Sequence, residues 1–219
     1  IFFAFSRIDG AVQMSGAILR TSTDGALSFA STNIEGGIFG RASENIPGLV
    51  SVGALILTKA SLGSDIDLDG ATLIAAPADG INGSDDYYAL AARDLRLTGG
   101  LRFGKVESLD NQAFQSFGLV HLPGARIEGS INAEGGQFIC NGALNFGDDD
   151  AQESHSTINL ADSVIDGDAR FEDSAIHGAL NLDGVRVSGD VELDRAVLRA
   201  VGDQDYQELL TKQPNILDR

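Results

Sequence analysis

The sequence predicts an all-β chain that folds into a parallel β-helix, or β-solenoid, with about 22 residues per coil and roughly seven coils. The first observation is a period of eleven residues, which is clearest at Ile165, Ile176, Val187 and Leu198. The second is an alternation of apolar and polar residues within each unit, the pattern of a strand with one buried face. The third is the glycine content, 27 of 219 residues, which disfavours helices.

Each unit starts with an apolar residue at position zero and continues with glycine at position two, apolar residues at positions four and six, and a small residue at position nine. Glycine at position two suits either a positive φ or a close approach of two backbones. The small residue is expected to point into a tight corner. The apolar residues should point inward and the polar residues beside them outward. Expected inward are Leu180, Leu182, Val191 and Leu193, and expected outward are Asn181, Asp183, Glu192 and Asp194.

Polar segments that break the period are predicted to be loops that leave one edge of the solenoid. They cover residues 40–48, 75–85, 111–116 and 147–155. Residues 1–201 are expected to form one solenoid domain. Residues 202–219 lack the repeat and are predicted to be a C-terminal cap or tail, with a short helix that begins at Asp205, because a solenoid must cover its terminal strand edges.

The composition excludes several classes of function. The net charge is −17, and residues 148–219 carry six basic and seventeen acidic residues. Direct nucleic-acid binding is not expected, because it needs a basic surface. No segment reaches the ~18 apolar residues that cross a bilayer, so no membrane span is expected in this segment. Cys140 is the single cysteine, so an internal disulfide is excluded and a buried, inert thiol is predicted. This cysteine usage slightly favours a cytoplasmic location and leaves the compartment open.

Acidic residues recur at positions three and seven of the unit, so that residues 22 apart are expected to stack on one side of the solenoid. We interpret these rows, together with an acidic loop, as a candidate docking face for a basic protein partner. A solvated, solubilising surface and a weak cation ladder are the alternatives. The candidate docking face consists of Asp148, Asp149, Asp150, Asp168, Glu172, Asp190 and Asp194.

The chain opens with an apolar strand that carries Phe2, Phe3 and Phe5. One interpretation is a first coil whose neighbour lies upstream, in a chain that is a fragment or a processed product. The other is a self-association edge, because an unpaired end of a β-helix is a template for another chain. The partner predicted from these features is therefore another protein or a second copy.

The residues offer little for catalysis. His121, His155 and His177 fall in different parts of the repeat, and no nucleophile, zinc or phosphate-binding motif is present. Asp65, Asp67 and Asp69 alternate on one strand but lack the pattern of a calcium-binding loop. No catalytic, cofactor-binding or metal-binding residue is assigned, and no cofactor is expected. Arginines that a polysaccharide lyase could use are expected to pair with acids instead; they are Arg170, Arg186, Arg195 and Arg199.

Two stretches carry a resemblance to a known group of proteins. They are VHLPGARIEGSINAEGGQF, which starts at Val120, and ALAARDLRLTGGLRF, which starts at Ala89 and follows the run GATL at Gly70. These stretches resemble bacterial β-helix proteins of the pentapeptide-repeat type, over about residues 8–198. The resemblance implies the fold and carries over no catalytic residue. Gyrase-inhibiting members keep a strict five-residue step, which glycine-bearing six-residue steps interrupt here.

The sequence therefore predicts a non-enzymatic β-solenoid that acts as a scaffold or a protein-interaction module. The first alternative is an acidic mimic of nucleic acid that occupies the site of a DNA-binding protein. The second alternative is a carbohydrate-active β-helix enzyme, which would need titratable groups that converge on one face.

Overall fold

The computed structural model describes residues 1–75, 88–109, 112–140 and 156–199, and among these residues it contains strands and no helix. The strands pair in parallel and form three sheets. The prediction of an all-β chain with parallel strands is thus confirmed. The tail at 202–219, with the helix expected from Asp205, lies outside the described residues.

Sheets I and II each contain seven strands of two residues. Sheet I consists of β1 (Arg7–Ile8), β4 (Asn33–Ile34), β7 (Ser61–Leu62), β11 (Arg96–Leu97), β15 (Arg126–Ile127), β19 (Val164–Ile165) and β23 (Arg186–Val187). Sheet II consists of β2 (Val12–Gln13), β5 (Ile38–Phe39), β8 (Ile66–Asp67), β12 (Leu101–Arg102), β16 (Ile131–Asn132), β20 (Ala169–Arg170) and β24 (Val191–Glu192).

Sheet III contains eleven strands in two columns, which the long strands β3 (Ile18–Ser28) and β6 (Val50–Ile56) join. One column contains β9 (Thr72–Ile74), β13 (Gln115–Phe117), β17 (Gln137–Ile139), β21 (Ala175–His177) and β25 (Val197–Arg199). The other contains β10 (Tyr88–Ala91), β14 (Leu119–His121), β18 (Ser156–Asn159) and β22 (Ala179–Asn181).

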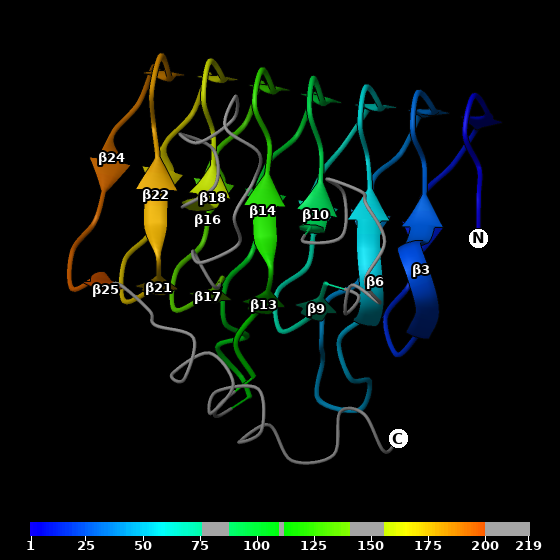
Figure 1. The fold of residues 1–219 in the computed structure, drawn as a ribbon, viewed down its shortest axis with the longest axis horizontal. Helices are drawn as coiled ribbons and strands as arrows, with labels where there is room; N and C mark the ends of the chain where they lie inside the picture. The colour runs from blue at the N-terminus through cyan, green and yellow to red at the C-terminus, as the bar shows by residue number, and fades with distance from the viewer. Residues whose placement is uncertain (76–87, 110–111, 141–155, 200–219) are drawn as a thin grey trace.

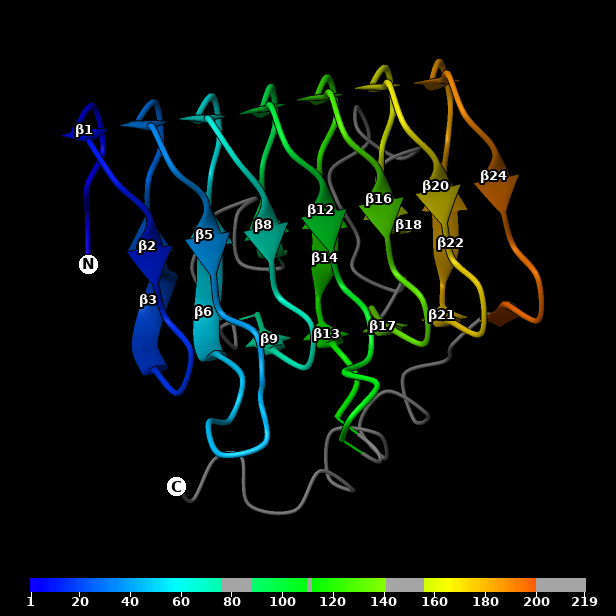
Figure 2. The same cartoon turned by 180° about the vertical axis from the view of Figure 1, so that it is seen from behind.

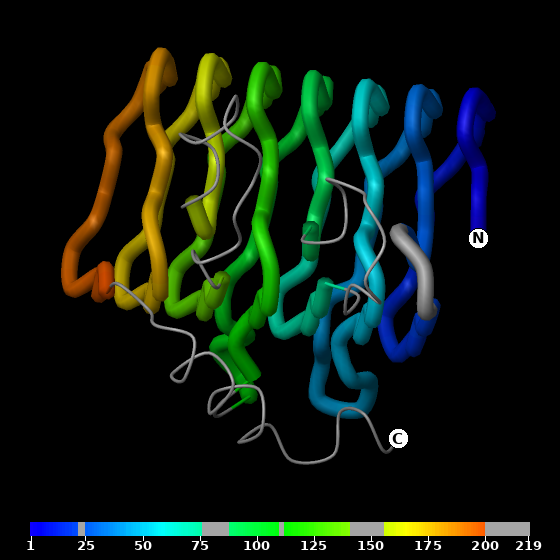
Figure 3. Tube along the Cα trace, viewed as in Figure 1, coloured from blue at the N-terminus to red at the C-terminus, as the bar shows by residue number. Residues whose placement is uncertain are grey.

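The chain passes through sheets I, II and III in this order and then returns to sheet I beside its previous strand. Figures 1 and 2, which view the molecule from opposite sides, show the strands side by side along its long axis. The N-terminus lies at one end of this axis, and β24 and β25 lie at the other. The trace in Figure 3 follows the same path several times along the axis. Such a path suits parallel strands, which a tight hairpin cannot connect.

The core is a set of apolar ladders on the inner faces of the sheets. In sheet II, Ile38 pairs with Ile66, Ile66 with Leu101, and Leu101 with Ile131. Each of these side chains is at most 1% exposed. Burial of a side chain of this size stabilises the fold by about 1.5–3 kcal/mol. Each strand of the ladder gains this stabilisation, which explains why position four of the unit is apolar.

Glycine at position two has two roles, which depend on the sheet. Between sheets I and II it permits a close approach: a Cβ on Gly167 would lie 2.9 Å from the carbonyl oxygen of Gly129. In sheet III it permits an unusual backbone: Gly118 and Gly178 both have a φ of 133°. Both roles foreseen from the sequence therefore occur, in alternate units. Most of the small residues at position nine are buried as predicted, for example Ala125 and Ser163, whereas Val185 and Ala196 are half-buried.

Pairs of neighbouring strands show how far the period holds. Val164 pairs with Arg186, which is 22 residues away, whereas Arg126 pairs with Val164, which is 38 residues away. The longer separation includes residues 141–155, which are among those not described. The predicted spacing therefore appears where no insertion intervenes.

The predicted loops have different outcomes. An antiparallel bridge between Ser43 and Ile46 confirms the loop at 40–48. The loop expected at 111–116 was placed wrongly, because a bridge between Lys105 and Ala113 bounds the insertion and Gln115–Phe117 is strand β13. The sequence KVESL at 105–109, where the insertion begins, contains no glycine or proline to mark a loop. The predicted loops at 75–85 and 147–155 lie outside the described residues, apart from the first position of 75–85.

The inward and outward predictions hold only in part. Leu180 and Leu182 pack half-buried against the core. Val191 and Leu193 are 46% and 41% exposed, so the prediction that they are buried is wrong. They belong to the last described turn of sheet II, and no further strand pairs with β24 there. Of the residues expected to point outward, Asp183 and Asp194 are exposed, while Asn181 and Glu192 are half-buried.

Candidate functional site

The outward face of sheet II carries a row of polar side chains at position five of the unit, which we call the charged face. Consecutive members belong to neighbouring paired strands, so their side chains lie side by side. The row consists of Asp67, Arg102, Asn132, Arg170 and Glu192. Because acids and arginines are interspersed along it, the charged face forms ion pairs between strands.

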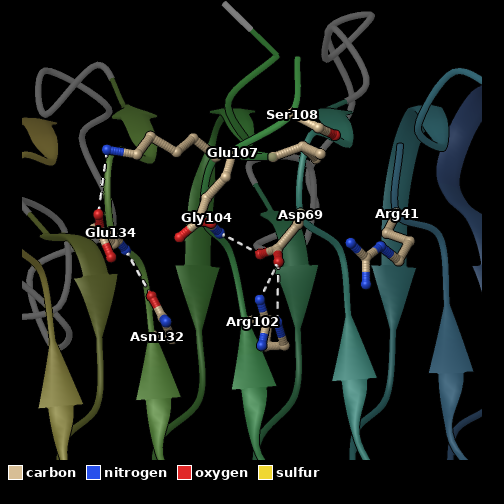
Figure 4. Close-up of a pocket in the computed structure, with 10 residues that line it drawn as sticks. Arg41, Asp69, Arg102, Gly104, Glu107, Ser108, Asn132 and Glu134 are labelled. Carbon is tan, nitrogen blue, oxygen red and sulfur yellow. Dashed lines mark hydrogen bonds and ion pairs between the residues drawn. The ribbon is translucent and has the colours of Figure 1, made fainter. Parts of the chain in front are cut away.

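A cavity of about 380 Å³ opens on the charged face beside the insertion that follows Gly104. Figure 4 shows its lining: Arg41 and Arg102 lie next to Asp69, and Asn132 and Glu134 lie beyond Gly104 on the neighbouring strand. Most of the lining is polar, and Val106 is its one large apolar side chain. The lining consists of Arg41, Asp69, Arg102, Gly104, Lys105, Val106, Glu107, Ser108, Asn132 and Glu134.

Asp69 forms the floor of the cavity and is only 2% exposed. Its Oδ1 accepts a hydrogen bond from the backbone N–H of Gly104 at 2.7 Å. Its Oδ2 accepts two from Arg102, from Nε at 2.9 Å and from Nη2 at 2.7 Å. These bonds raise the pKa of the Arg102 guanidinium above its ordinary value. Charge-assisted bonds of this kind fix both side chains.

Asp67 lies beneath the arginines of the same cavity. Its Oδ1 accepts the backbone N–H of Asp69 at 3.2 Å, and its Oδ2 lies 3.3 Å from Nη1 of Arg41. Burial raises the pKa of the Asp67 carboxyl, and the negative charge of Asp69 raises it further. Two carboxylates in one buried site thus depend on Arg41 and Arg102 for compensation.

The burial of Asp69 corrects an expectation from the sequence. Acids at position seven were expected on a solvated outer surface, and Asp194 indeed lies there. Asp69 differs because it bonds the N–H of Gly104, where the chain leaves the repeat for the insertion. Phe103 and Phe114 anchor the two ends of this insertion, with ring centroids 4.7 Å apart.

The far wall of the cavity is an ion pair, with Nζ of Lys105 3.2 Å from a carboxylate oxygen of Glu134. Asn132 lies beside it, and its Oδ1 accepts the backbone N–H of Glu134 at 3.0 Å. This site was not predicted from the sequence. The available signal was the change from Asp67 to Arg102 to Asn132 at position five of units that pair in space, which places opposite charges on adjacent strands.

The candidate docking face is in part assembled by the structure. Asp168 and Asp190 precede the neighbouring strands β20 and β24. The backbone N–H of Asp190 donates to Oδ1 of Asp168 at 3.1 Å. Glu172 and Asp194 likewise follow the paired strands β20 and β24 at equal positions. Asp148, Asp149 and Asp150 lie outside the described residues.

Arginines neutralise much of this surface. Nη2 of Arg170 lies 2.7 Å from Asp168, and its Nε lies 3.4 Å from Glu192. Arg195 binds both carboxylate oxygens of Asp173, at 2.5 and 2.9 Å, and thereby lowers the pKa of that carboxyl. The prediction that Arg170 and Arg195 pair with acids is thus confirmed.

The two histidines that the structure describes lie on different strands of sheet III, β14 and β21. His121 is 3% exposed on β14, neither ring nitrogen has a hydrogen-bond partner, and burial followed by the charge of Arg93 lowers its pKa to about 4. His177 lies half-buried on β21, and His155 is outside the described residues. Cys140 is buried, as predicted, and burial raises the pKa of its thiol to about 12.

The aromatic edge at the N-terminal end is exposed in this chain. Phe2 and Phe5 are 75% and 86% exposed. Phe3 is 42% exposed, and its ring stacks on Phe29 with centroids 5.3 Å apart. Phe2 forms a parallel bridge to Ser28, so this segment adds a further strand edge to sheet III.

Among the described residues, no three His, Cys, Asp or Glu side chains are placed to hold a metal ion. The part of the chain that the structure describes also contains no helix long and apolar enough to cross a membrane. The chain matches no model of a known protein family and no curated protein.

Proposed function

We propose that this chain is a β-solenoid of about seven coils that acts as a non-enzymatic scaffold or protein-interaction module. Support for the solenoid comes from the seven strands each of sheets I and II and from the fixed order in which the chain visits the sheets. The resemblance to repeat proteins of the pentapeptide type supports the same architecture.

The observation that carries the interaction function is the open end at β23, β24 and β25. Each of these strands has a neighbour on one side only among the described residues. Large apolar side chains are 41–54% exposed there: Val191, Leu193, Val197 and Leu198. Unpaired strand edges beside exposed apolar residues bind a further strand from another chain.

The partner that fits this end best is a second copy of the chain, stacked head to tail. Val12 begins the core ladder of sheet II that Val191 ends, and Leu19 lies in the column of sheet III that ends with Leu198. Stacking would place apolar residues on apolar residues in each column. The exposed Phe2 and Phe3 would then pack against the edge of β22. A head-to-tail contact of this kind does not close and forms filaments.

Light scattering on the chain over a range of concentrations tests this proposal. Wild type should assemble, whereas Leu193→Lys at one end and Phe3→Lys at the other should not. Ile46→Lys is the control, because Ile46 is 47% exposed and lies on the loop at 40–48, outside the strands at either end. A strict monomer at every concentration would exclude stacking. Stacking would also be excluded if Ile46→Lys abolished assembly as fully as the two end variants do.

A second candidate, the docking of a basic protein on the acidic rows, is favoured by the direct contact of Asp168 with Asp190. Such a partner should be captured from the source cell at low salt and lost at high salt. Reversal of Asp190 and Asp194 to Lys should weaken capture more than reversal of the exposed Asp9 and Glu44. If both pairs of reversals weaken capture equally, the acidic rows are a solubilising surface, and the hypothesis of a nucleic-acid mimic is excluded with them.

The third candidate, a carbohydrate-active enzyme, has less support. An acid–base pair must reach its substrate, whereas Asp67 and Asp69 are 6% and 2% exposed. Both also hold an arginine, which commits their oxygens to structural contacts.

A further inference from the structure

We propose that the cavity on the charged face binds a small polyhydroxylated anion, namely a sugar acid or a sugar phosphate. This binding site is independent of the assembly proposed above, because the cavity lies on the side of the molecule and not at an end. The chemistry shared by both ligands is one anionic group next to several hydroxyls.

The unused hydrogen-bonding capacity of the cavity consists mainly of donors. A guanidinium has five N–H donors, and Arg41 spends one nitrogen on a single contact to Asp67 at 3.3 Å. Arg102 spends Nε and Nη2 on Asp69 and keeps Nη1. Asn132 uses its oxygen for the turn, which leaves its amide N–H groups. A ligand that satisfies these groups must bring acceptors.

Several acceptors of the lining are already engaged. Both oxygens of Asp69 accept bonds from Arg102 or Gly104, and Glu134 faces Lys105 at 3.2 Å. Glu107 is the exception, and it stands exposed at the rim. The lining holds three acids and three bases, and Asp67 beneath Arg41 adds a fourth acid. The preference for an anion therefore comes from the unused N–H donors and not from the net charge.

Size and polarity narrow the ligand further. A volume of about 380 Å³ lies at the lower end of the range for small-molecule sites. With Val106 as the one large apolar side chain, the lining contains no aromatic surface on which a base or a phenyl ring could stack. A compact ligand rich in hydroxyls is the class that remains. Its carboxylate or phosphate would lie between Arg41, which can bind it through two N–H groups, and Arg102, which can donate from Nη1.

The hydroxyls of the ligand would lie toward the other wall. Ser108 on the insertion and the Asn132 amide are neutral polar groups that suit a hydroxyl partner, and Glu107 can accept from one. Figure 4 shows Asn132 on the strand next to that of Arg102, and Ser108 on the insertion above Asp69. The two walls thus recognise different parts of one molecule, so neither glucose nor phosphate alone should satisfy the site.

Isothermal titration calorimetry on the full 219-residue chain tests the proposal with four probes: glucuronate, glucose 6-phosphate, glucose and inorganic phosphate. We expect glucuronate, glucose 6-phosphate or both to bind at least tenfold more tightly than glucose and than phosphate. Which of the two anionic sugars binds identifies the source of the anionic group. Equal binding of glucose, equal binding of phosphate, or no heat from either anionic sugar at millimolar concentration would overturn the proposal.

Variants locate the site. Arg41→Gln should weaken the anionic sugar at least tenfold, and the fold should survive because the Arg41 side chain is 49% exposed. Arg96→Gln on the exposed side of sheet I is the matched control and should leave binding unchanged. Ser108→Ala should weaken the sugar and leave inorganic phosphate unaffected. Unchanged binding in Arg41→Gln, with an intact thermal transition, would exclude this cavity. None of these variants should alter assembly, so the two proposals fail separately.

Discussion

Burial changes the acid–base chemistry of three side chains in this molecule. Asp67 and Cys140 have raised pKa values, and His121 has a lowered one. In each case burial is the largest cause, because an environment of low polarity disfavours the charged form. The repeat brings these residues into the interior, since a side chain on a strand between two others loses solvent on both sides.

The His121 pKa of about 4 makes the stability of the fold depend on pH. In the unfolded chain an imidazole titrates near 6.5, so between these values the unfolded chain binds a proton that the folded chain does not. Stability is full above about pH 6.5 and falls as the pH drops toward 4, by about 1.4 kcal/mol per pH unit at most. Urea unfolding of wild type and His121→Leu at pH 4.5 and 7.5 should show a smaller pH difference in the variant. The same difference in both proteins would contradict the assignment.

Substitution of a core residue at position six should lower the free energy of unfolding more in the middle of the sheets than near their last described strands. Leu122 is 1% exposed, whereas Leu182 lies half-buried two strands nearer the open end. Leu122→Ala should reduce the free energy of unfolding by about 2–4 kcal/mol, because it leaves a cavity. Leu182→Ala should cost about 1 kcal/mol, since solvent already reaches the site. Denaturant unfolding measures both, and equal losses would mean that the end of the stack is covered in solution.

At the scale of the elements, the corners between strands place different requirements on the backbone. The corner between sheets I and II brings glycine backbones together, with the N–H of Gly167 3.1 Å from the carbonyl oxygen of Gly129. The corner at position eight requires a positive φ, which Asp173, Gly184 and Arg195 all adopt. The residue type at position eight therefore varies. At position two, in contrast, the close approach of two backbones leaves no room for a side chain.

Two glycines of the same corner make a matched pair. A Cβ on Gly167 would meet Oγ of Ser130 at 2.3 Å and the backbone of Gly129 at 2.9 Å, whereas a Cβ on Gly10 would meet nothing within 4 Å. Gly167→Ala should destabilise the fold by about 1–3 kcal/mol, because the strands must separate. Gly10→Ala should be nearly neutral. Thermal unfolding of both variants checks this, and a neutral Gly167→Ala would show that the corner can shift.

At the scale of the whole molecule, charge and shape act in opposite directions. In the proposed assembly the last described strands, β23–β25, would pair with a second copy, while a net charge of −17 makes two copies repel each other. At ~0.15 M salt the Debye length is about 8 Å, so repulsion between stacked copies is only partly screened. Ionic strength should therefore control assembly.

Stacking should increase with salt, and docking of a basic partner should decrease with it. Sedimentation of the chain at about 0.05 M and 0.5 M salt measures the first, and capture of the partner at the same concentrations measures the second. Leu193→Lys, which is expected not to stack, serves as the control for non-specific salting-out. If assembly weakens with salt, ion pairs and not apolar strand ends hold the copies together.

Much of the fold could be predicted because the period repeats local information. A residue such as Ile131 meets Leu101 and Ala169, its counterparts on the neighbouring strands of sheet II, so its environment follows from its own position in the unit. Parallel strands, inward apolar ladders and small buried corner residues were predicted on this basis. The cavity was not predicted, since Arg41 and Lys105 lie where the chain departs from the repeat.

The eleven-residue pattern alone accounts for the all-β class, the parallel pairing and the side of each strand that faces the core. Solvent exposure depends instead on what lies next to a residue in space. Asp69 has the same place in its unit as Asp194, yet it is buried, because it bonds Gly104 and Arg102 of the next strand beside an insertion. Val191 has the same place as Ile131, yet it is exposed, because no described strand follows β24. The burial of Asp69 and the exposure of Val191 thus depend on neighbours from distant parts of the chain, which a local sequence pattern cannot specify.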